Sequence, residues 1–154
     1  SMVKGKINGQ YVNSVLAKRE VMKAGYQEAI MLDTEGYVSE ASGENFFVIK
    51  DGVIYTAPYG SSILGGITRD TIITLAREKG YTVREERFTR DFVYVADEIF
   101  MTGTAAELTP VREVDDRQIG AGKPGPVTMD MQETYFDTVR GKNGAHNEWL
   151  TIVE

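Results

Sequence analysis

Residues 44–58 read ENFFVIKDGVIYTAP, two apolar runs on either side of Asp51-Gly52. An Asp-Gly pair suits a tight β-turn with positive φ, so this stretch predicts a β-hairpin. Before it, residues 27–33 (QEAIMLD) form a short apolar run, and residues 34–40 (TEGYVSE) supply a Gly-containing turn and a return strand. We therefore expect a second hairpin, whose first strand is buried, N-terminal to the first.

Three segments follow the helical period instead. The first, about residues 9–24, places three apolar side chains on one face: Val12, Val15 and Leu16. The second, residues 67–80 (ITRDTIITLAREKG), ends at a glycine that suits a helix C-terminus. The third, about residues 126–140, has apolar side chains four residues apart: Val127, Met131, Tyr135 and Val139. We expect these helices to pack on the strands.

The remaining segments are short. Residues 81–88 alternate like a strand, residues 89–97 predict a short helix, and residues 98–104 a buried strand. Residues 107–119 predict another hairpin, and residues 142–154 an extended tail that docks Trp149 and Leu150 onto the body. Hairpins mixed with about three packing helices are not repeated βαβ units. The predicted class is therefore mixed α/β with much antiparallel pairing, rather than a Rossmann sheet.

The amino-acid composition excludes several classes of protein and of functional site. The 154 residues, 42% of them hydrophobic and 26% charged, suit one folded domain and exclude intrinsic disorder. Seventeen Lys and Arg against 23 Asp and Glu give a net charge of −6, which disfavours nucleic acid as a partner. The chain has no Cys and one His, so disulfides, cysteine-ligated metals, a cysteine nucleophile and a histidine metal cluster are excluded.

Targeting signals are not apparent. No stretch approaches the roughly 18 apolar residues of a membrane span, and the first ten residues lack a secretory h-region, so we expect a cytoplasmic protein. Ser1 and Met2 are interpreted as the remnant of an expression tag. Some polar groups are interpreted as structural: the pairs Asp97-Glu98 and Asp115-Asp116 as surface turn charges, and His146 as a solvated side chain.

Two loops have the features of phosphate sites. LGGITRD (64–70) places two glycines and Thr68 at the start of a predicted helix, where free N–H groups favour an anion. MTGTAAE (101–107) places Gly103 and Thr104 after a buried strand. An ordinary flexible loop with a Thr cap remains the alternative for the first, but two such loops favour a phosphorylated ligand.

A lysine and a carboxylate complete the pattern. Lys6, close to Tyr11, offers an amine that can form a Schiff base, and Glu40 offers a carboxylate that can hold a pyridine nitrogen protonated. A lysine amine, a carboxylate and a phosphate-binding site are the groups that a protein needs to bind pyridoxal 5′-phosphate. From these residues alone, an alternative remains: Lys6 can be an ordinary surface lysine and Glu40 an ordinary turn residue.

The order of these motifs resembles the C-terminal, cofactor-binding domain of the branched-chain amino acid aminotransferases, which are fold type IV pyridoxal-phosphate enzymes. Four segments carry the resemblance: KINGQYVNSVLAKRE (6–20), GYVSEASGENFFVIKDG (36–52), LGGITRD (64–70) and MTGTAAELTPV (101–111). The last favours the branched-chain subgroup over the D-amino acid aminotransferases and aminodeoxychorismate lyases of the same fold type, which remain alternatives. LGG stands where the family more commonly has L-P-G, so a more mobile loop is expected.

The resemblance implies a role for each matching residue. Lys6 would be the Schiff-base lysine, with Lys4 as its nearby rival, Tyr11 a donor to the cofactor's phenolic oxygen, and Glu40 the partner of its ring nitrogen. The other implied cofactor contacts are Leu64 beneath the ring and, at the phosphate, Gly66, Ile67, Thr68, Gly103 and Thr104. Thr104 and the N–H of Ala105 would bind the substrate carboxylate.

The resemblance also implies an architecture and a reaction. Residues 3–154 would form the large domain, a mixed α/β pseudo-barrel, without the small N-terminal domain that normally adds an arginine to the phosphate. The implied reaction transfers the amino group of leucine, isoleucine or valine to 2-oxoglutarate in at least a homodimer. The alternative is a truncated, non-catalytic module that keeps the ligand pocket.

Overall fold

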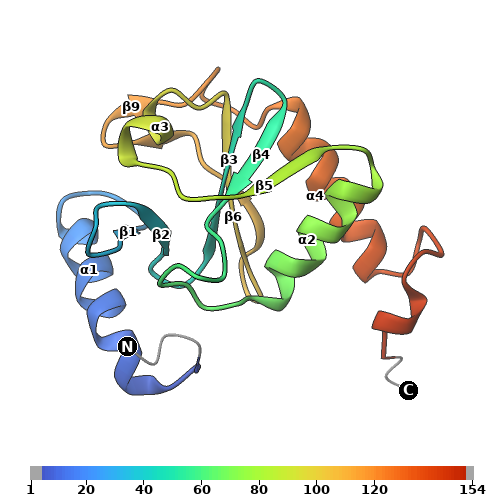
Figure 1. Ribbon diagram of the computed structural model, residues 1–154, viewed down its shortest axis with the longest axis horizontal. Coiled ribbons are helices and arrows are strands. Elements are labelled where there is room, and N and C mark those ends of the chain that lie inside the picture. Colours follow the sequence, from blue (N-terminus) through green and yellow to red (C-terminus); the bar gives the residue numbers. More distant parts are fainter. Residues whose placement is uncertain (1–4, 152–154) are drawn as a thin grey trace.

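A five-stranded sheet forms the centre of the computed structural model, which describes residues 5–151 (Figure 1). Its strand order is β5-β4-β3-β6-β7. The strands are β3 (Asn45–Lys50), β4 (Val53–Thr56), β5 (Thr82–Glu85), β6 (Glu98–Gly103) and β7 (Glu107–Pro110). All neighbours are antiparallel except β4 and β5, which run parallel and are joined through helix α2 (Ile67–Glu78). The predicted mixed α/β class with mostly antiparallel pairing is confirmed.

Strand β3 is buried on both faces, which explains its continuous apolar run. Successive side chains point to opposite faces, so Phe46 and Val48 enter one core and Phe47 and Ile49 the other. The second core is covered by α2 and α4 (Pro126–Val139), which lie together in Figure 1. The central strand thus organises two hydrophobic layers.

The hairpins agree with the sequence in part. Asp51 and Gly52 connect β3 and β4 with φ values of 50° and 76°, as predicted. The earlier hairpin pairs β1 (Ile30–Leu32) with β2 (Val38–Ala41), but β1 is not buried. Residues 107–119 do not form one hairpin, because β7 pairs with β6 instead. The residues after it make a smaller hairpin from β8 (Glu113–Val114) and β9 (Arg117–Gln118).

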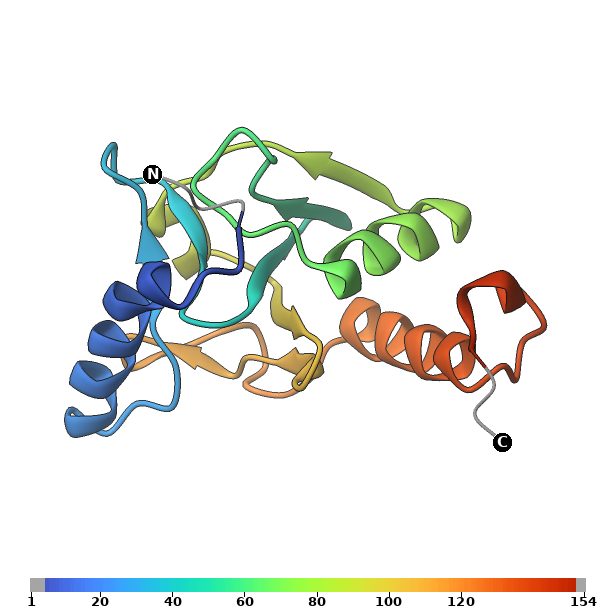
Figure 2. The same cartoon turned by 90° about the horizontal axis from the view of Figure 1, so that it is seen from below.

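Helix α1 (Tyr11–Lys23) has no buried residue, although the sequence predicted an apolar packing face. Four of its large apolar side chains are at least half exposed: Val12, Val15, Leu16 and Met22. Figure 2 shows α1 at one edge of the molecule, away from α2 and α4. The short helices are η1 (Asn8–Gln10), α3 (Arg90–Tyr94), which was predicted, and η2 (Asn147–Trp149).

Two polar groups differ from the sequence interpretation. Glu98, predicted to be a surface charge, is only 9% exposed and accepts the N–H groups of Val127 and Thr128 at 3.1 and 2.7 Å. It therefore caps α4, a tertiary role that local sequence does not signal. His146 is not simply solvated, because its ring contacts Glu78 and Glu148 at 2.9 and 3.3 Å and stacks on Trp149.

Candidate functional site

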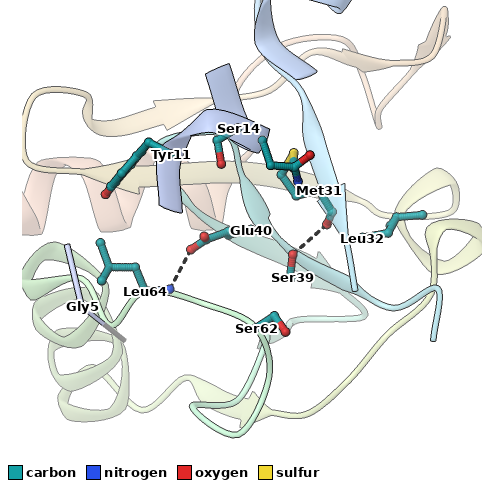
Figure 3. Close-up of a pocket in the computed structure, with 10 residues that line it drawn as sticks. Gly5, Tyr11, Ser14, Met31, Leu32, Ser39, Glu40, Ser62 and Leu64 are labelled. Atoms are coloured by element: carbon teal, nitrogen blue, oxygen red, sulfur yellow. Dashed lines mark hydrogen bonds between the residues drawn. The ribbon is translucent and has the colours of Figure 1, made fainter. Parts of the chain in front are cut away.

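A cavity of about 290 Å³ lies between the start of α1, the β1–β2 hairpin and the loop before α2 (Figure 3). In Figure 3, Tyr11 and Ser14 come from α1, Ser39 and Glu40 from β2, and Leu64 from the loop. The lining residues are Gly5, Tyr11, Asn13, Ser14, Met31, Leu32, Ser39, Glu40, Ser62 and Leu64. Three segments far apart in the sequence thus meet around one carboxylate.

Glu40 is the titratable group of this cavity whose environment is most unusual. Its Oε2 accepts the backbone N–H of Leu64 at 2.9 Å. Burial raises the pKa of Glu40 from 4.5 to about 6, and the Leu64 N–H opposes that rise only in part. A carboxyl group in such surroundings holds a proton readily and becomes a stable anion when a cation lies beside it.

This shift predicts a pH-dependent effect of Glu40→Gln on stability. Because the folded-state pKa is raised, the folded protein binds the proton more tightly, and the contribution of Glu40 to the free energy of unfolding falls as pH rises from 4.5 through 6. Gln stays neutral. We expect the variant to be more stable than the parent above pH 6, by at most about 2 kcal/mol, and equal to it near pH 4.

The measurement is urea unfolding of both proteins across this pH range. Glu133→Gln, on the exposed surface of α4, is the matched control and should show no such divergence. A Glu40→Gln variant that is less stable at pH 7 than at pH 4, relative to the parent, contradicts the desolvation of Glu40.

The turn Leu64-Gly65-Gly66 is held closely beside Glu40. The Asn45 side-chain amide donates to the Leu64 carbonyl at 2.9 Å, while Glu40 takes the Leu64 N–H. A Cβ atom on Gly66 would overlap Asn45 Oδ1, so this position requires glycine for space. Gly66 is the N-cap of α2 and provides no side-chain cap, which leaves the first N–H groups of the helix available to an anion.

The second predicted phosphate loop lies at the same end of the sheet. Asn45, which contacts the first turn, pairs with Thr102 across β3 and β6. Gly103 follows directly, and a Cβ atom there would lie 3.3 Å from Glu44 Cγ. Thr104 and Ala105 are exposed in the turn between β6 and β7. Strand pairing thus brings together two loops that are far apart in the sequence.

The predicted residues are not all on one surface. Tyr11, Glu40 and Leu64 line the cavity, and Lys6 is an exposed residue next to Gly5, which also lines it. Ile67 is 84% exposed, whereas Thr68 is buried, and both line a second cavity of about 530 Å³. That cavity lies between α2, α4 and the C-terminal segment, from which Trp149 and Leu150 line it. The predicted extended tail is wrong in part, because Asn147–Trp149 form the short helix η2 and Trp149 remains 45% exposed. The roles of the site residues stay predictions.

Sequence reasoning missed two residues that shape the turn. Asn45 begins a strand and gives no local signal, yet it is buried and contacts both Leu64 and Gly66. Arg69 was part of a quoted motif, but its complete burial could not be foreseen from an amphipathic helix pattern. Within residues 5–151, no group of three or more metal-ligating side chains is present, and no helix is long and apolar enough to span a membrane.

The sequence of this chain matches a known family of proteins. Residues 4–114 match the family model of the class IV amino-transferases. The chain belongs to that family, and the membership predicted from its motifs is confirmed.

Its relatives narrow the class to branched-chain-amino-acid aminotransferases. The chain is 60% identical over 154 residues to the Pseudomonas aeruginosa enzyme of that name, and 51% identical over 148 residues to that of Escherichia coli K12. These matches cover 100% and 96% of this chain but 50% and 48% of the relatives. The chain therefore spans about half the length of the curated relatives that it matches.

Solved structures of branched-chain amino acid aminotransferases have the same fold as this chain. The Escherichia coli branched-chain amino acid aminotransferase superposes with a TM-score of 0.95 at 49% identity, over 99% of this chain and 50% of that one. The enzyme of the same name from Thermobaculum terrenum, solved in its PLP-form (holo-form), gives a TM-score of 0.94 at 40% identity. That match covers 96% of this chain and 48% of the other. The fold of this half is therefore that of the branched-chain aminotransferases.

Proposed function

We propose that this chain is the cofactor-binding half of an enzyme that transfers the amino group of leucine, isoleucine or valine to 2-oxoglutarate with pyridoxal 5′-phosphate. The observation that carries the proposal is the meeting of Tyr11, Glu40 and Leu64 around one cavity, next to a glycine turn that opens a helix. Family membership and the PLP-form named for the Thermobaculum terrenum structure support it.

The residues of the site fit this cofactor. Glu40 uses one oxygen for the Leu64 N–H and keeps acceptor capacity for a pyridine N–H. The free N–H groups at the start of α2, with the glycines and Thr68, suit a phosphate. When bound, the cofactor supplies an aldehyde that captures amines and a ring that accepts electrons.

Each residue of this chain then has a defined task. Lys6 Nζ holds the cofactor and later receives the proton that leaves the substrate Cα. Glu40 keeps a proton at the ring nitrogen, and Tyr11 donates its hydroxyl to the phenolic oxygen. Leu64 would contact the cofactor ring, and Gly66, Ile67, Thr68, Gly103 and Thr104 would hold the phosphate. Thr104 and the Ala105 N–H orient the substrate carboxylate.

The assembly is also part of the proposal. Residues 3–154 form the C-terminal large domain, and a second domain completes the phosphate site and the side-chain pocket in at least a homodimer, in the cytoplasm. Exposure of the apolar face of α1 favours such a covering partner.

A chimera tests the proposed function. Replacing the matching half of the Pseudomonas aeruginosa relative with this chain is expected to give an enzyme that consumes L-leucine with 2-oxoglutarate, because the chain matches that relative along its whole length. The measurement is a coupled assay of glutamate formation, with D-alanine as the control substrate, and cleavage of aminodeoxychorismate is followed separately by the pyruvate that it releases. Turnover of D-alanine in preference would favour the D-amino acid subgroup, and a chimera that binds the cofactor without turnover would favour the non-catalytic module.

A further inference from the structure

Gly65 is a glycine because a neighbouring side chain occupies the space where its Cβ atom would lie. A Cβ atom there would be 2.5 Å from Tyr59 Cε1 and 3.2 Å from Tyr59 Oη. Gly65 does not have a positive φ, so its backbone does not itself require glycine. The Tyr59 ring therefore lies directly against the turn where the family more commonly has proline.

Tyr59 is itself held from two sides. Its hydroxyl donates to Asp70 Oδ2, and this hydrogen bond raises the pKa of Tyr59. The guanidinium carbon of Arg69 lies 4.5 Å from the centre of the Tyr59 ring, a cation–π contact. The ring consequently has a fixed place although the residue is 42% exposed.

Arg69 links this ring to the sheet. Its side chain is fully buried, and its Nη2 donates to the Ala57 carbonyl and to Glu85 Oε1, both at 2.9 Å. Its Nη1 donates to Asp70 Oδ1 at 3.0 Å. Ala57 follows β4 and Glu85 ends β5, so a continuous set of contacts joins the parallel strand pair to the turn.

We propose that Tyr59 and Arg69 are positioning residues of the turn Leu64-Gly65-Gly66, and that the packing of Tyr59 on Gly65 restrains this turn. The loop is then not looser for having two glycines. The pair fixes the N–H groups of Ile67 and Thr68, which on the proposed function receive the phosphate of the cofactor. Gly65 and Tyr59 depend on each other, because a side chain at position 65 would displace the Tyr59 ring and the loss of the ring would leave the turn at Gly65 without its packing.

The experiment compares Tyr59→Ala, Gly65→Ala and the double variant with the parent chain. The ligand-free measurement is hydrogen exchange of the backbone amides of Leu64 and Asp70, which donate to Glu40 Oε2 and to the Gly66 carbonyl and so report on the turn from both ends. We expect exchange to become about tenfold faster in each single variant, because the first loses the ring and the second displaces it. The double variant should exchange no faster than Tyr59→Ala alone, since the added methyl group then meets no ring.

Tyr94→Ala is the matched control. Tyr94 also donates its hydroxyl to an aspartate, Asp115, and lies 4.4 Å under a guanidinium, that of Arg117, but it is in the region of the β8–β9 hairpin. Its loss should leave the exchange of the Leu64 and Asp70 amides unchanged. Additive effects of the two substitutions, or unchanged exchange in both single variants, would overturn the proposal.

A ligand measurement separates this proposal from the proposed function. The dissociation constants of pyridoxal 5′-phosphate and of pyridoxal, which lacks the phosphate, are measured for the same proteins. We expect Tyr59→Ala and Gly65→Ala to lose about tenfold in affinity for the phosphorylated compound and less than about twofold for pyridoxal. A parent chain that binds both compounds equally would contradict the proposed phosphate site, and the amide exchange would still decide the role of Tyr59. Equal losses for both compounds would contradict a role in positioning the phosphate turn.

Discussion

Replacing Lys6 with alanine is expected to abolish the trapping of pyridoxal 5′-phosphate by borohydride and, in the chimera, to lower turnover by roughly 10⁴-fold or more. The physical reason is that one amine performs two tasks. Borohydride fixes the cofactor by reducing a carbon–nitrogen double bond to a lysine, and the same amine later carries the substrate proton. Lys6 is exposed and follows Gly5, a residue of the cavity wall, so its backbone lies at the edge of the cavity.

Other lysines provide the controls for this experiment. Lys18 pairs with Glu28 at 2.9 Å, and its removal should leave labelling intact. Lys4 is the sequence rival of Lys6 and lies outside the described residues. Peptide mapping of the reduced protein therefore distinguishes the three. A label on Lys4 or Lys18, or full labelling of Lys6→Ala, would show that the assignment of the cofactor lysine is wrong.

Local patterns predicted those elements whose cause is local. The Asp51-Gly52 turn needs two positive φ values, which these residue types accept more readily than most, and the structure has both. The 3.6-residue period of α2 reflects its buried stripe, which includes Ile72, Leu75 and Ala76. In both cases the signal lies in adjacent residues, so a single sequence suffices.

Elements that depend on distant partners were predicted less well. Residues 107–110 read as the first strand of a new hairpin, but hydrogen bonding to β6 decides their pairing. The apolar residues of α1 satisfy a helical period without meeting a core, because periodicity shows only that a face exists. Glu98 was misjudged for a similar reason: its partners are the N–H groups at the start of α4, far away in the sequence.

In the candidate site, too, features with a local cause could be predicted from the sequence and features that depend on distant segments could not. Three of the residues for which the resemblance implies a role, Tyr11, Glu40 and Leu64, line one cavity, whereas Ile67 and Thr68 line the second. The residues that hold the glycine turn in place, Asn45, Tyr59 and Arg69, come from β3, the loop after β4 and α2. Their contribution arises only when these segments pack together, so the local motif LGG could not reveal it.

The isolated chain is expected to transaminate leucine roughly 10³-fold more slowly than the chimera, although every residue assigned to the chemistry lies within it. The chain spans about half the length of its relatives. Loss of one charged contact to the phosphate costs about 1.5–3 kcal/mol, or roughly 10- to 150-fold in affinity for the cofactor. Loss of the groups that close over and orient the substrate adds a further factor of about 10².

The exposed apolar surface of α1 predicts that the isolated chain self-associates. Helix α1 exposes Val12, Val15, Leu16 and Met22 and buries none of them, and a single charged substitution such as Leu16→Glu would interrupt this surface without disturbing a core. We expect light scattering to show oligomers of the parent chain and a larger monomer fraction for Leu16→Glu, with Arg19→Glu as the control for added negative charge on the same helix. The activity is measured in parallel with leucine and 2-oxoglutarate at one limiting concentration of pyridoxal 5′-phosphate for parent chain and chimera, with Lys6→Ala as the background. Turnover by a monomeric parent chain at a rate near that of the chimera would contradict both expectations, because it would show that this half alone binds the phosphate, excludes water and orients the substrate.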